Sequence, residues 1–397
     1  MQYPRLSNQR ILSIDAFRGI TILVMIFVNE LAGIRDIPQW MKHMPADADA
    51  MSFVDAVFPA FLFIAGMSIP FAINNRLKKG DTVWQLQQHI LFRTLGLLVL
   101  GVFLVNTEEG YNETMMGMSI NLWALLFLAA AILVWKVYYT NNKILVYGLK
   151  AAGLITLAIL AFIYKSENGE HITPKWWGIL GLIGWAYLYG CIIFQMCKGN
   201  IFLLILMIAV CTGIYIVSHT ASLEDKTWLQ WAGAQSGNAI NTSIVLSGMI
   251  LSLIFFQMDK PVKETSRFLS AGLLSIALLI AAYFLRPYYK ISKIHGTPSW
   301  ALYSAGICCI IFIFLYWLID KKHIKNRTAF FKPAASNPLL TYIIPDIVYF
   351  LTAWLGISLF PVSLRYGLPG LLWSAFYAVV VMGIVILLNK MKIKLQL

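Results

Sequence analysis

The sequence has few charged residues, and this scarcity excludes most classes of soluble protein. Only 12% of its 397 residues are Asp, Glu, Lys or Arg, whereas 59% are hydrophobic and the mean hydropathy is +0.72. A soluble domain cannot cover so much apolar surface, but a polytopic membrane protein exposes it to lipid. We therefore expect an all-α polytopic membrane protein.

Other features are absent as well. The sequence has no Pro- and Gly-rich linker, no block of like charge and no low-complexity segment, so we expect a single domain over residues 1–397. No small-residue cleavage site follows the first apolar run, which favours a retained helix over a removed signal peptide. The five cysteines are odd in number and match no disulfide or metal-site spacing, so we expect packing residues and no metal.

Twelve apolar runs are long enough to cross a bilayer, which takes about 20 residues of helix. The seventh run is short and follows the sixth closely, so ten or eleven spans are alternatives. The runs cover approximately residues 12–32, 52–74, 87–106, 118–137, 144–164, 175–196, 200–218, 238–257, 268–286, 299–320, 336–359 and 369–389.

The basic residues are distributed unevenly among the loops between these runs. If successive loops alternate sides, 22 of the 31 Lys and Arg fall on the side of the two termini, and most of the acids fall on the other. The positive-inside rule then predicts that both termini are cytoplasmic. This asymmetry accounts for the net charge of +13 without a nucleic-acid partner.

Trp and Tyr residues gather near the predicted ends of the spans. An aromatic belt at the membrane interfaces is the favoured interpretation, and stacking of one or two rings on a sugar is the alternative. The residues concerned are Trp176, Trp177, Tyr288, Tyr289 and Trp300.

The first apolar run begins with ILSIDAFRGI and ends with FVNE. Asp15 and Arg18 are three residues apart, so they can share one helix face and form a pair. Alternatively, Arg18 extends toward the lipid headgroups and Asp15 caps the helix. A carboxylate in an apolar run is costly unless it is paired or functional, and Asn29 and Glu30 add polar groups at the other end.

Two stretches of the sequence together resemble a known family. RILSIDAFRGITILVMIFVN followed by SFVDAVFPAFLFIAGMSI is similar to the paired opening of the heparan-alpha-glucosaminide N-acetyltransferase family, with its D-x-F-R-G helix start, closing Asn, loop His and D-x-V-F-P-x-F-x-F-I-x-G. The motif-bearing core is residues 10–107. Fainter similarity covers most of the remaining chain. No luminal domain precedes the motif, so we expect a bacterial form in the inner (plasma) membrane.

The resemblance implies an enzyme that moves acetyl from cytosolic acetyl-CoA to the amine of a glucosamine-like sugar on the extracytoplasmic side. His43 corresponds to the family's catalytic loop His; a general base and a nucleophile that forms an acetyl-imidazole both remain open. Asn29 is expected to stabilise an oxyanion or to orient His43. Asp55 either fixes the imidazole or caps the helix near Ser52.

Further residues are candidates for binding the two substrates. We expect Arg18 and Arg93 to contact the CoA phosphates by charge-assisted hydrogen bonds, with Asp15 and His89 at the same entrance. The acceptor candidates are Glu30, Asn106 and Lys293, of which the last two match fainter family motifs.

Asp346 follows Pro345 inside an apolar run and matches no family motif, so a functional and a structural role are equally supported. Two other functions remain open: a transporter of a small sugar, and an O-acyltransferase that decorates envelope glycans. The sequence also leaves open whether the protein is a homodimer.

Overall fold

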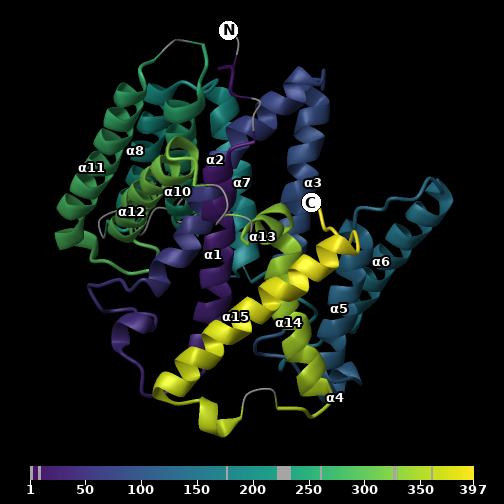
Figure 1. Ribbon diagram of the computed structural model, residues 1–397. Helices are drawn as coiled ribbons and strands as arrows, with labels where there is room; N and C mark the ends of the chain where they lie inside the picture. The colour runs from purple at the N-terminus through teal and green to yellow at the C-terminus, as the bar shows by residue number, and fades with distance from the viewer. Residues whose placement is uncertain are drawn as a thin grey trace. The chain divides into compact units, whose positions relative to one another are not determined.

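The computed structural model is all-α. It describes residues 3–7, 10–175, 178–220, 234–259, 262–324, 328, 330–358 and 361–397, and within these ranges it holds isolated β-bridges but no strand. The long helices (Figure 1) are α1 (Leu12–Leu31), α2 (Val57–Lys78), α3 (Val83–Val105), α5 (Ile120–Trp135), α6 (Lys143–Ile163), α7 (Ile179–Met196), α8 (Ile201–Ser218), α10 (Ser236–Phe256), α11 (Glu264–Tyr289), α12 (Pro298–Tyr316), α14 (Pro338–Trp354) and α15 (Gly367–Lys390). Short helical turns are η1 (Gln39–Met41), η2 (Val54–Ala56), α4 (Glu113–Met116), η4 (Trp317–Lys321), α13 (Lys332–Ser336) and η6 (Val362–Leu364).

Ten helices in the described part of the chain are long and apolar enough to cross a membrane, judged by length and composition. Two further apolar helices, α5 and α14, are shorter. Each of the twelve apolar runs thus corresponds to a helix, with ends that differ by a few residues. The predicted all-α polytopic membrane protein is confirmed, while the side on which the termini lie stays a prediction.

The chain forms two compact units, which we describe one at a time. The division falls within α1, α3 and α7, and the single domain expected over residues 1–397 stays a prediction. The first unit consists of Met1–Thr21, Pro38–Thr94 and Ile183–Ala329, and the second of Ile22–Ile37, Leu95–Leu182 and Phe330–Leu397.

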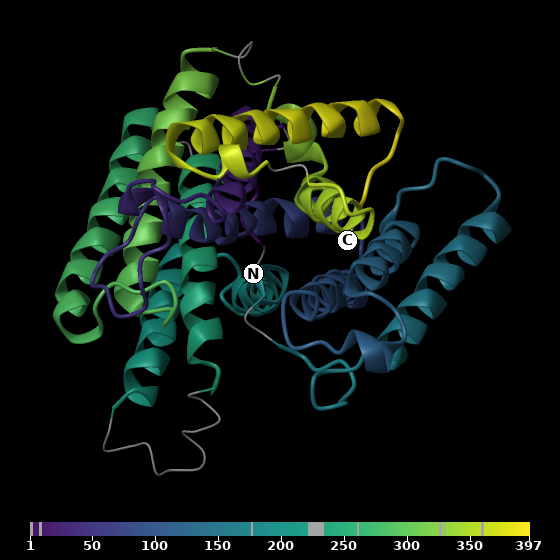
Figure 2. The same cartoon turned by 90° about the horizontal axis from the view of Figure 1, so that it is seen from below.

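In the first unit, helix α10 is almost wholly buried. It packs along α2, α8 and α12, and α12 packs along α11 (Figures 1 and 2). A Cβ added at Gly66 would lie 1.9 Å from the carbonyl oxygen of Val245, and one at Gly248 would lie 2.0 Å from that of Phe63. Small residues allow such close backbone contact, which drives helix association in lipid. The glycine of the second motif therefore serves the packing of α2 on α10.

In the second unit, α5 packs against α6 and α14, and α14 packs against α15. Asn337, at the start of α14, holds the C-terminal segment to this unit. Its Nδ2 donates to Asn389 Oδ1 and to the Ile393 carbonyl oxygen, each at 2.9 Å, and its Oδ1 accepts from the Leu395 amide at 3.1 Å. This asparagine thus has a structural role.

Candidate active site

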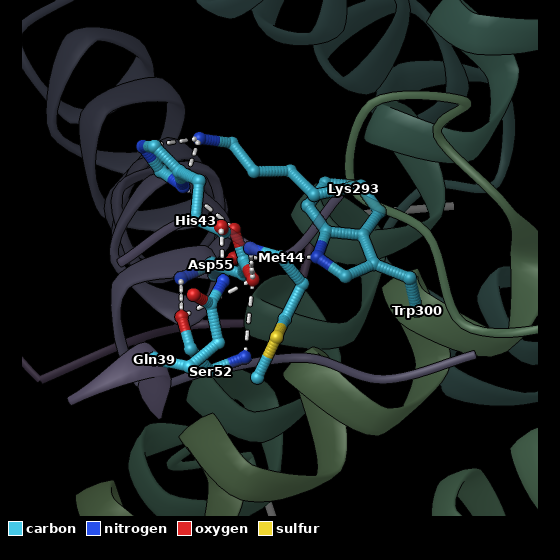
Figure 3. Close-up of polar contacts among 7 residues, drawn as sticks. All are labelled: Gln39, His43, Met44, Ser52, Asp55, Lys293 and Trp300. Carbon is cyan, nitrogen blue, oxygen red and sulfur yellow. Dashed lines mark hydrogen bonds and ion pairs between the residues drawn. The ribbon is translucent and has the colours of Figure 1, made fainter. Parts of the chain in front are cut away.

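His43 lies in the loop between α1 and α2 and contacts Asp55 in the short turn η2 (Figure 3). His43 Nδ1 is 2.6 Å from Asp55 Oδ1. The Asp55 side chain is 2% exposed and that of His43 is 47% exposed, so the imidazole extends from a buried carboxylate toward the surface. Gln39 Nε2 donates to the His43 carbonyl oxygen at 3.3 Å. The structure brings together the two residues that the sequence offered as base and orienting acid.

The second oxygen of the Asp55 carboxylate is held by the loop itself. Oδ2 accepts from the Ser52 amide at 3.0 Å, the Ser52 hydroxyl at 3.2 Å and the Met44 amide at 3.2 Å. The Asp55 amide is 3.3 Å from Ser52 Oγ, to which it donates. Asp55 therefore contacts the imidazole with one oxygen and closes the turn at Ser52 with the other, while its role in fixing the base stays a prediction.

Lys293 approaches the imidazole from the loop between α11 and α12 (Figure 3). Its Nζ is 3.3 Å from both ring nitrogens of His43. Burial lowers the pKa of the Lys293 ammonium below its usual range, and the Asp55 carboxylate opposes that shift. The sequence proposed Lys293 for the acceptor, and the structure places it beside the proposed base.

The two loops that carry His43 and Lys293 are tied together. Arg286 Nε pairs with Asp49 at 3.0 Å, and Asp49 Oδ1 accepts from the Ile291 amide at 2.8 Å. Ser292 Oγ donates to the Ala46 carbonyl oxygen at 2.7 Å. These contacts, each made by at least one side chain, join segments more than 200 residues apart and hold the loop of Lys293 beside the loop of His43.

Trp300 supports the site through a buried contact with the backbone of Asp55. It is 1% exposed, its Nε1 donates to the Asp55 carbonyl oxygen at 3.2 Å, and its ring stacks on Phe58. The aromatic-belt interpretation is therefore wrong for Trp300, because its indole has a buried hydrogen-bond partner. Trp176 and Trp177 lie outside the described residues.

The contacts assign the imidazole tautomer. A carboxylate only accepts hydrogen bonds, so the Nδ1 of His43 carries the proton shared with Asp55, and in the neutral imidazole Nε2 then carries the lone pair. The Lys293 ammonium is equally close to both ring nitrogens, so it places a cation beside the imidazole without selecting one nitrogen. The three side chains form a buried acid, an oriented imidazole and a cation, which is an arrangement suited to proton abstraction with stabilisation of a developing negative charge.

Arg18 lies within the first unit, in α1. Its Nη1 is 3.5 Å from Asp15 Oδ1, and its Nη2 donates to Ser68 Oγ on α2 at 2.7 Å. Asp15 also pairs with Arg10 at 2.5 Å. The pair expected from the i, i+3 spacing is present, although the shorter contact of Asp15 is to Arg10.

Arg93 and His89 lie on α3, one turn apart, also in the first unit. The guanidinium of Arg93 lies 4.8 Å from the centroid of the Tyr187 ring. The buried Nε of Arg93 has no hydrogen-bond partner among the described residues. The charge of Arg93 acts on both Arg18 and His89, so the four residues proposed for the donor gather in one region.

The other predicted site residues belong to the second unit. Asn29 is exposed near the end of α1, and Glu30 lines a cavity of that unit. Asp346 lies in α14, close enough to Glu108 for their charges to interact. Asn106 is 1% exposed.

The Nδ2 of Asn106 donates to the carbonyl oxygens of Val102 at 2.8 Å and Thr173 at 2.9 Å. Its amide group therefore holds a loop, which argues for a structural role. Its substrate contact stays a prediction.

Sequence reasoning missed the residues that position the site. These are Asp49, Arg286 and Ser292, which join the two loops, and Trp300, which supports Asp55. The only available signal was their nearness in sequence to His43 and Lys293. All five cysteines are free and buried, and the described residues include no group of three or more His, Cys, Asp or Glu side chains that could hold a metal ion.

Comparison with known proteins supports these motifs. The chain is 36% identical over 98 residues to heparan-alpha-glucosaminide N-acetyltransferase of Homo sapiens, which covers 24% of this chain and 14% of the human protein. It is 34% identical over 103 residues to that of Mus musculus, covering 26% of this chain and 15% of the mouse protein. The resemblance to this acetyltransferase family is confirmed, over a small part of each relative. Residues 10–246 match the model of a family described as a domain of unknown function, DUF5009, and the chain belongs to that family.

Proposed function

We propose that the protein is a transmembrane acetyltransferase that moves acetyl from cytosolic acetyl-CoA to the amine of a glucosamine-like sugar on the extracytoplasmic side of a bacterial inner membrane. The observation that carries the proposal is the 2.6 Å contact between His43 and the buried Asp55. It lies in a chain similar to two N-acetyltransferases over about a quarter of its length.

His43 Nε2 removes the proton of the attacking amine as the carbon–nitrogen bond to the acetyl carbonyl forms. The Asp55 carboxylate stabilises the imidazolium that results. The Lys293 ammonium, 3.3 Å from Nε2, stabilises the carbonyl oxygen as it gains negative charge. The carbon–sulfur bond then breaks, and the thiolate takes the proton. Asn29 is proposed as a further oxyanion donor or as an orienting group for His43.

A second route uses the same imidazole as a nucleophile. His43 Nε2 attacks the thioester carbonyl, the carbon–sulfur bond breaks with release of the CoA thiolate, and an acetyl-imidazole forms. The amine then attacks this acetyl group, the bond to Nε2 breaks, and the thiolate takes the proton of the amine. The contact with Asp55 supports this route as well, because an oriented Nδ1–H leaves the Nε2 lone pair for attack.

For the donor, we propose that Arg18 and Arg93 hold the CoA phosphates, with Asp15 and His89 positioning them. Three guanidinium groups, those of Arg10, Arg18 and Arg93, lie near the one carboxylate of Asp15 and leave an excess of positive charge. An anionic ligand would also satisfy the buried Arg93 Nε, which lacks a hydrogen-bond partner among the described residues. Arg–phosphate contacts are charge-assisted and directional, so the residues present fit a phosphate-bearing donor.

The test is incubation of purified protein with labelled acetyl-CoA and a panel of amino sugars, followed by mass analysis. Transfer to glucosamine is expected, and His43→Ala should lower its rate by about 10²–10⁴-fold while leaving donor binding intact. Full transfer by that variant would remove His43 from the mechanism. A labelled adduct on His43 would select the nucleophilic route, label on a hydroxyl would select the O-acyltransferase, and sugar uptake without acetylation would select the transporter.

A further inference from the structure

A cavity of about 390 Å³ lies in the first unit, at the ends of three helices that are long and apolar enough to cross a membrane. Its wall consists of the start of α8, the end of α10, and the start of α11 with the loop before it. Helix α10 packs against both of the others (Figure 1). Ligand cavities in proteins measure about 300–1,000 Å³. Because three spans begin or end here, we place this cavity at the level of the lipid headgroups.

The N-terminal segment of the chain joins the parts of this wall. The Met258 amide donates to the Arg5 carbonyl oxygen at 2.8 Å, and the Arg5 amide donates to Asp259 Oδ2 at 2.9 Å. A Cβ added at Gly199 would lie 2.8 Å from the side chain of Pro4, so the segment also packs closely on the turn before α8. The ends of α8 and α10 are therefore connected through a third part of the same unit.

Arg267 supplies a positioned positive charge to the cavity. Its Nη1 donates to the Phe255 carbonyl oxygen at 2.6 Å, and its Nη2 donates to the Gln257 carbonyl oxygen at 3.4 Å. These bonds cap the end of α10 and use two of the five N–H groups of the guanidinium. Within the described residues Arg267 forms no ion pair and no further hydrogen bond. A cation that lines a cavity without an acidic partner favours an anionic ligand.

The charges around this guanidinium are mostly positive. Lys198 and Lys263 are each next in sequence to a residue that lines the cavity, and both are exposed. Of the two acids in the loop and the first turn of α11, Glu264 pairs with Lys321 at 3.2 Å. Asp259 accepts hydrogen bonds from uncharged donors only. Even with Asp259 counted, the cations at the cavity outnumber the acids.

Apolar side chains line the same cavity. Phe202 is 82% exposed and Val262 is 46% exposed, and Ile254 adds an aliphatic side chain from α10. A small soluble anion leaves such apolar surface uncovered, whereas the acyl chain of a lipid covers it. The combination of a cation with adjoining apolar groups therefore favours a ligand with an anionic head and a hydrocarbon tail.

We propose that this cavity binds an anionic phospholipid, with the phosphate on the Arg267 guanidinium and an acyl chain along Phe202. Arginine holds phosphate by directional, charge-assisted hydrogen bonds. The sequence places these residues on the side predicted to be cytoplasmic, and basic pockets between membrane-spanning helices on that side bind anionic headgroups. The site uses none of the residues proposed for acetyl transfer, so the inference is independent of that function.

The test compares dimyristoyl phosphatidylglycerol with dimyristoyl phosphatidylcholine, by native mass spectrometry of the full-length protein in detergent. The two lipids share their acyl chains and phosphate, but choline adds a positive charge. Phosphatidylglycerol should bind roughly 10–100-fold more tightly, since each basic residue near a headgroup favours the anionic lipid. Arg267→Gln should remove most of this preference, and Lys263→Gln should weaken phosphatidylglycerol by about 5-fold. Lys143→Gln, at an exposed lysine that begins α6, is the control and should change neither affinity.

A second variant tests the cavity without touching the cap of α10. Ser270 lines the cavity and makes no hydrogen bond among the described residues. Ser270→Phe should therefore fill part of the cavity, weaken phosphatidylglycerol and leave the Tm in detergent without lipid unchanged. The inference thus stays testable if Arg267→Gln fails to fold.

Equal affinity of the wild-type protein for the two lipids would overturn the inference. So would an unchanged preference in Arg267→Gln, or an unchanged phosphatidylglycerol affinity in Ser270→Phe. Inorganic phosphate and CoA are then added as competitors, each equimolar with the lipid. Displacement by inorganic phosphate would assign the cavity to a free anion, and displacement by CoA would assign it to the soluble donor; either result overturns the lipid assignment. Retention of the lipid against both supports it.

Discussion

The His43 site and the Arg18–Arg93 region, both in the first unit, differ in how completely their polar groups are satisfied. At Asp55, both carboxylate oxygens have partners, four donors in all from His43, Ser52 and Met44. In the arginine region, Arg18 Nη2 donates to Ser68 Oγ at 2.7 Å, but the buried Arg93 Nε has no hydrogen-bond partner in the described part of the chain.

The difference suggests two kinds of task. A hydrogen-bond network in which every polar group has a partner holds one geometry. A general base requires this, because it must meet its substrate in a set orientation. A buried donor without a partner is costly, and a ligand that supplies the missing acceptor recovers that cost on binding. We therefore interpret the first region as chemistry and the second as recognition, and kinetics can separate the two.

The largest effect is expected for Asp55→Asn. The amide offers one oxygen in place of two, so it cannot serve both His43 Nδ1–H and the donors of Ser52 and Met44. If the amide nitrogen faces His43, the imidazole proton moves to Nε2 and the base is lost. We expect kcat to fall by about 10²–10⁴-fold with the KM for acetyl-CoA unchanged, measured by steady-state transfer to glucosamine.

The control for this change is Asp47→Asn, which alters a fully exposed carboxylate in the same loop, 3.9 Å from His295. It should leave both constants within about 2-fold, as surface ion pairs contribute little. A decrease in kcat as large as that of Asp55→Asn would mean that the loop, and not the oriented imidazole, limits the rate.

A smaller effect, on the KM for acetyl-CoA rather than on kcat, is expected for Arg18→Gln and Arg93→Gln. Loss of a charge-assisted hydrogen bond costs about 1.5–3 kcal/mol, so the KM for acetyl-CoA should rise by roughly 10–100-fold while kcat changes little. The effect should diminish with added salt. Lys143→Gln removes an exposed basic residue outside the cluster and should leave KM unchanged. A decrease in kcat with an unchanged KM would assign the arginines to catalysis. The distinction between a catalytic region at His43 and a recognition region at the arginines would then be wrong.

The sequence predicted the helices well because bilayer spans are encoded by long apolar runs, which do not depend on distant contacts. It also predicted His43, Asp55 and Lys293 through motifs. It could not predict that Lys293 meets His43 across 250 positions, because that contact depends on the pairing of Asp49 with Arg286 and of Ser292 with Ala46. Trp300 was misassigned for the same reason: an indole near a helix end looks alike in sequence whether it faces lipid or a buried carbonyl.

The smallest effect concerns the pH dependence of stability at Lys293. Because burial lowers its pKa below 10.5 in the folded protein, the ammonium costs stability wherever both folded and unfolded chains are protonated. As pH rises past the lowered pKa, the folded protein releases this proton first, and the cost disappears by the time both states are neutral. Between pH 7 and 10.5, the Tm of the protein should therefore rise by at most a few degrees relative to that of Lys293→Met. Lys290→Met, at an exposed lysine of the same loop, should show no such pH-dependent difference. A difference that is constant with pH would show that the ammonium is solvated, and it would then be too well screened to stabilise an oxyanion beside His43.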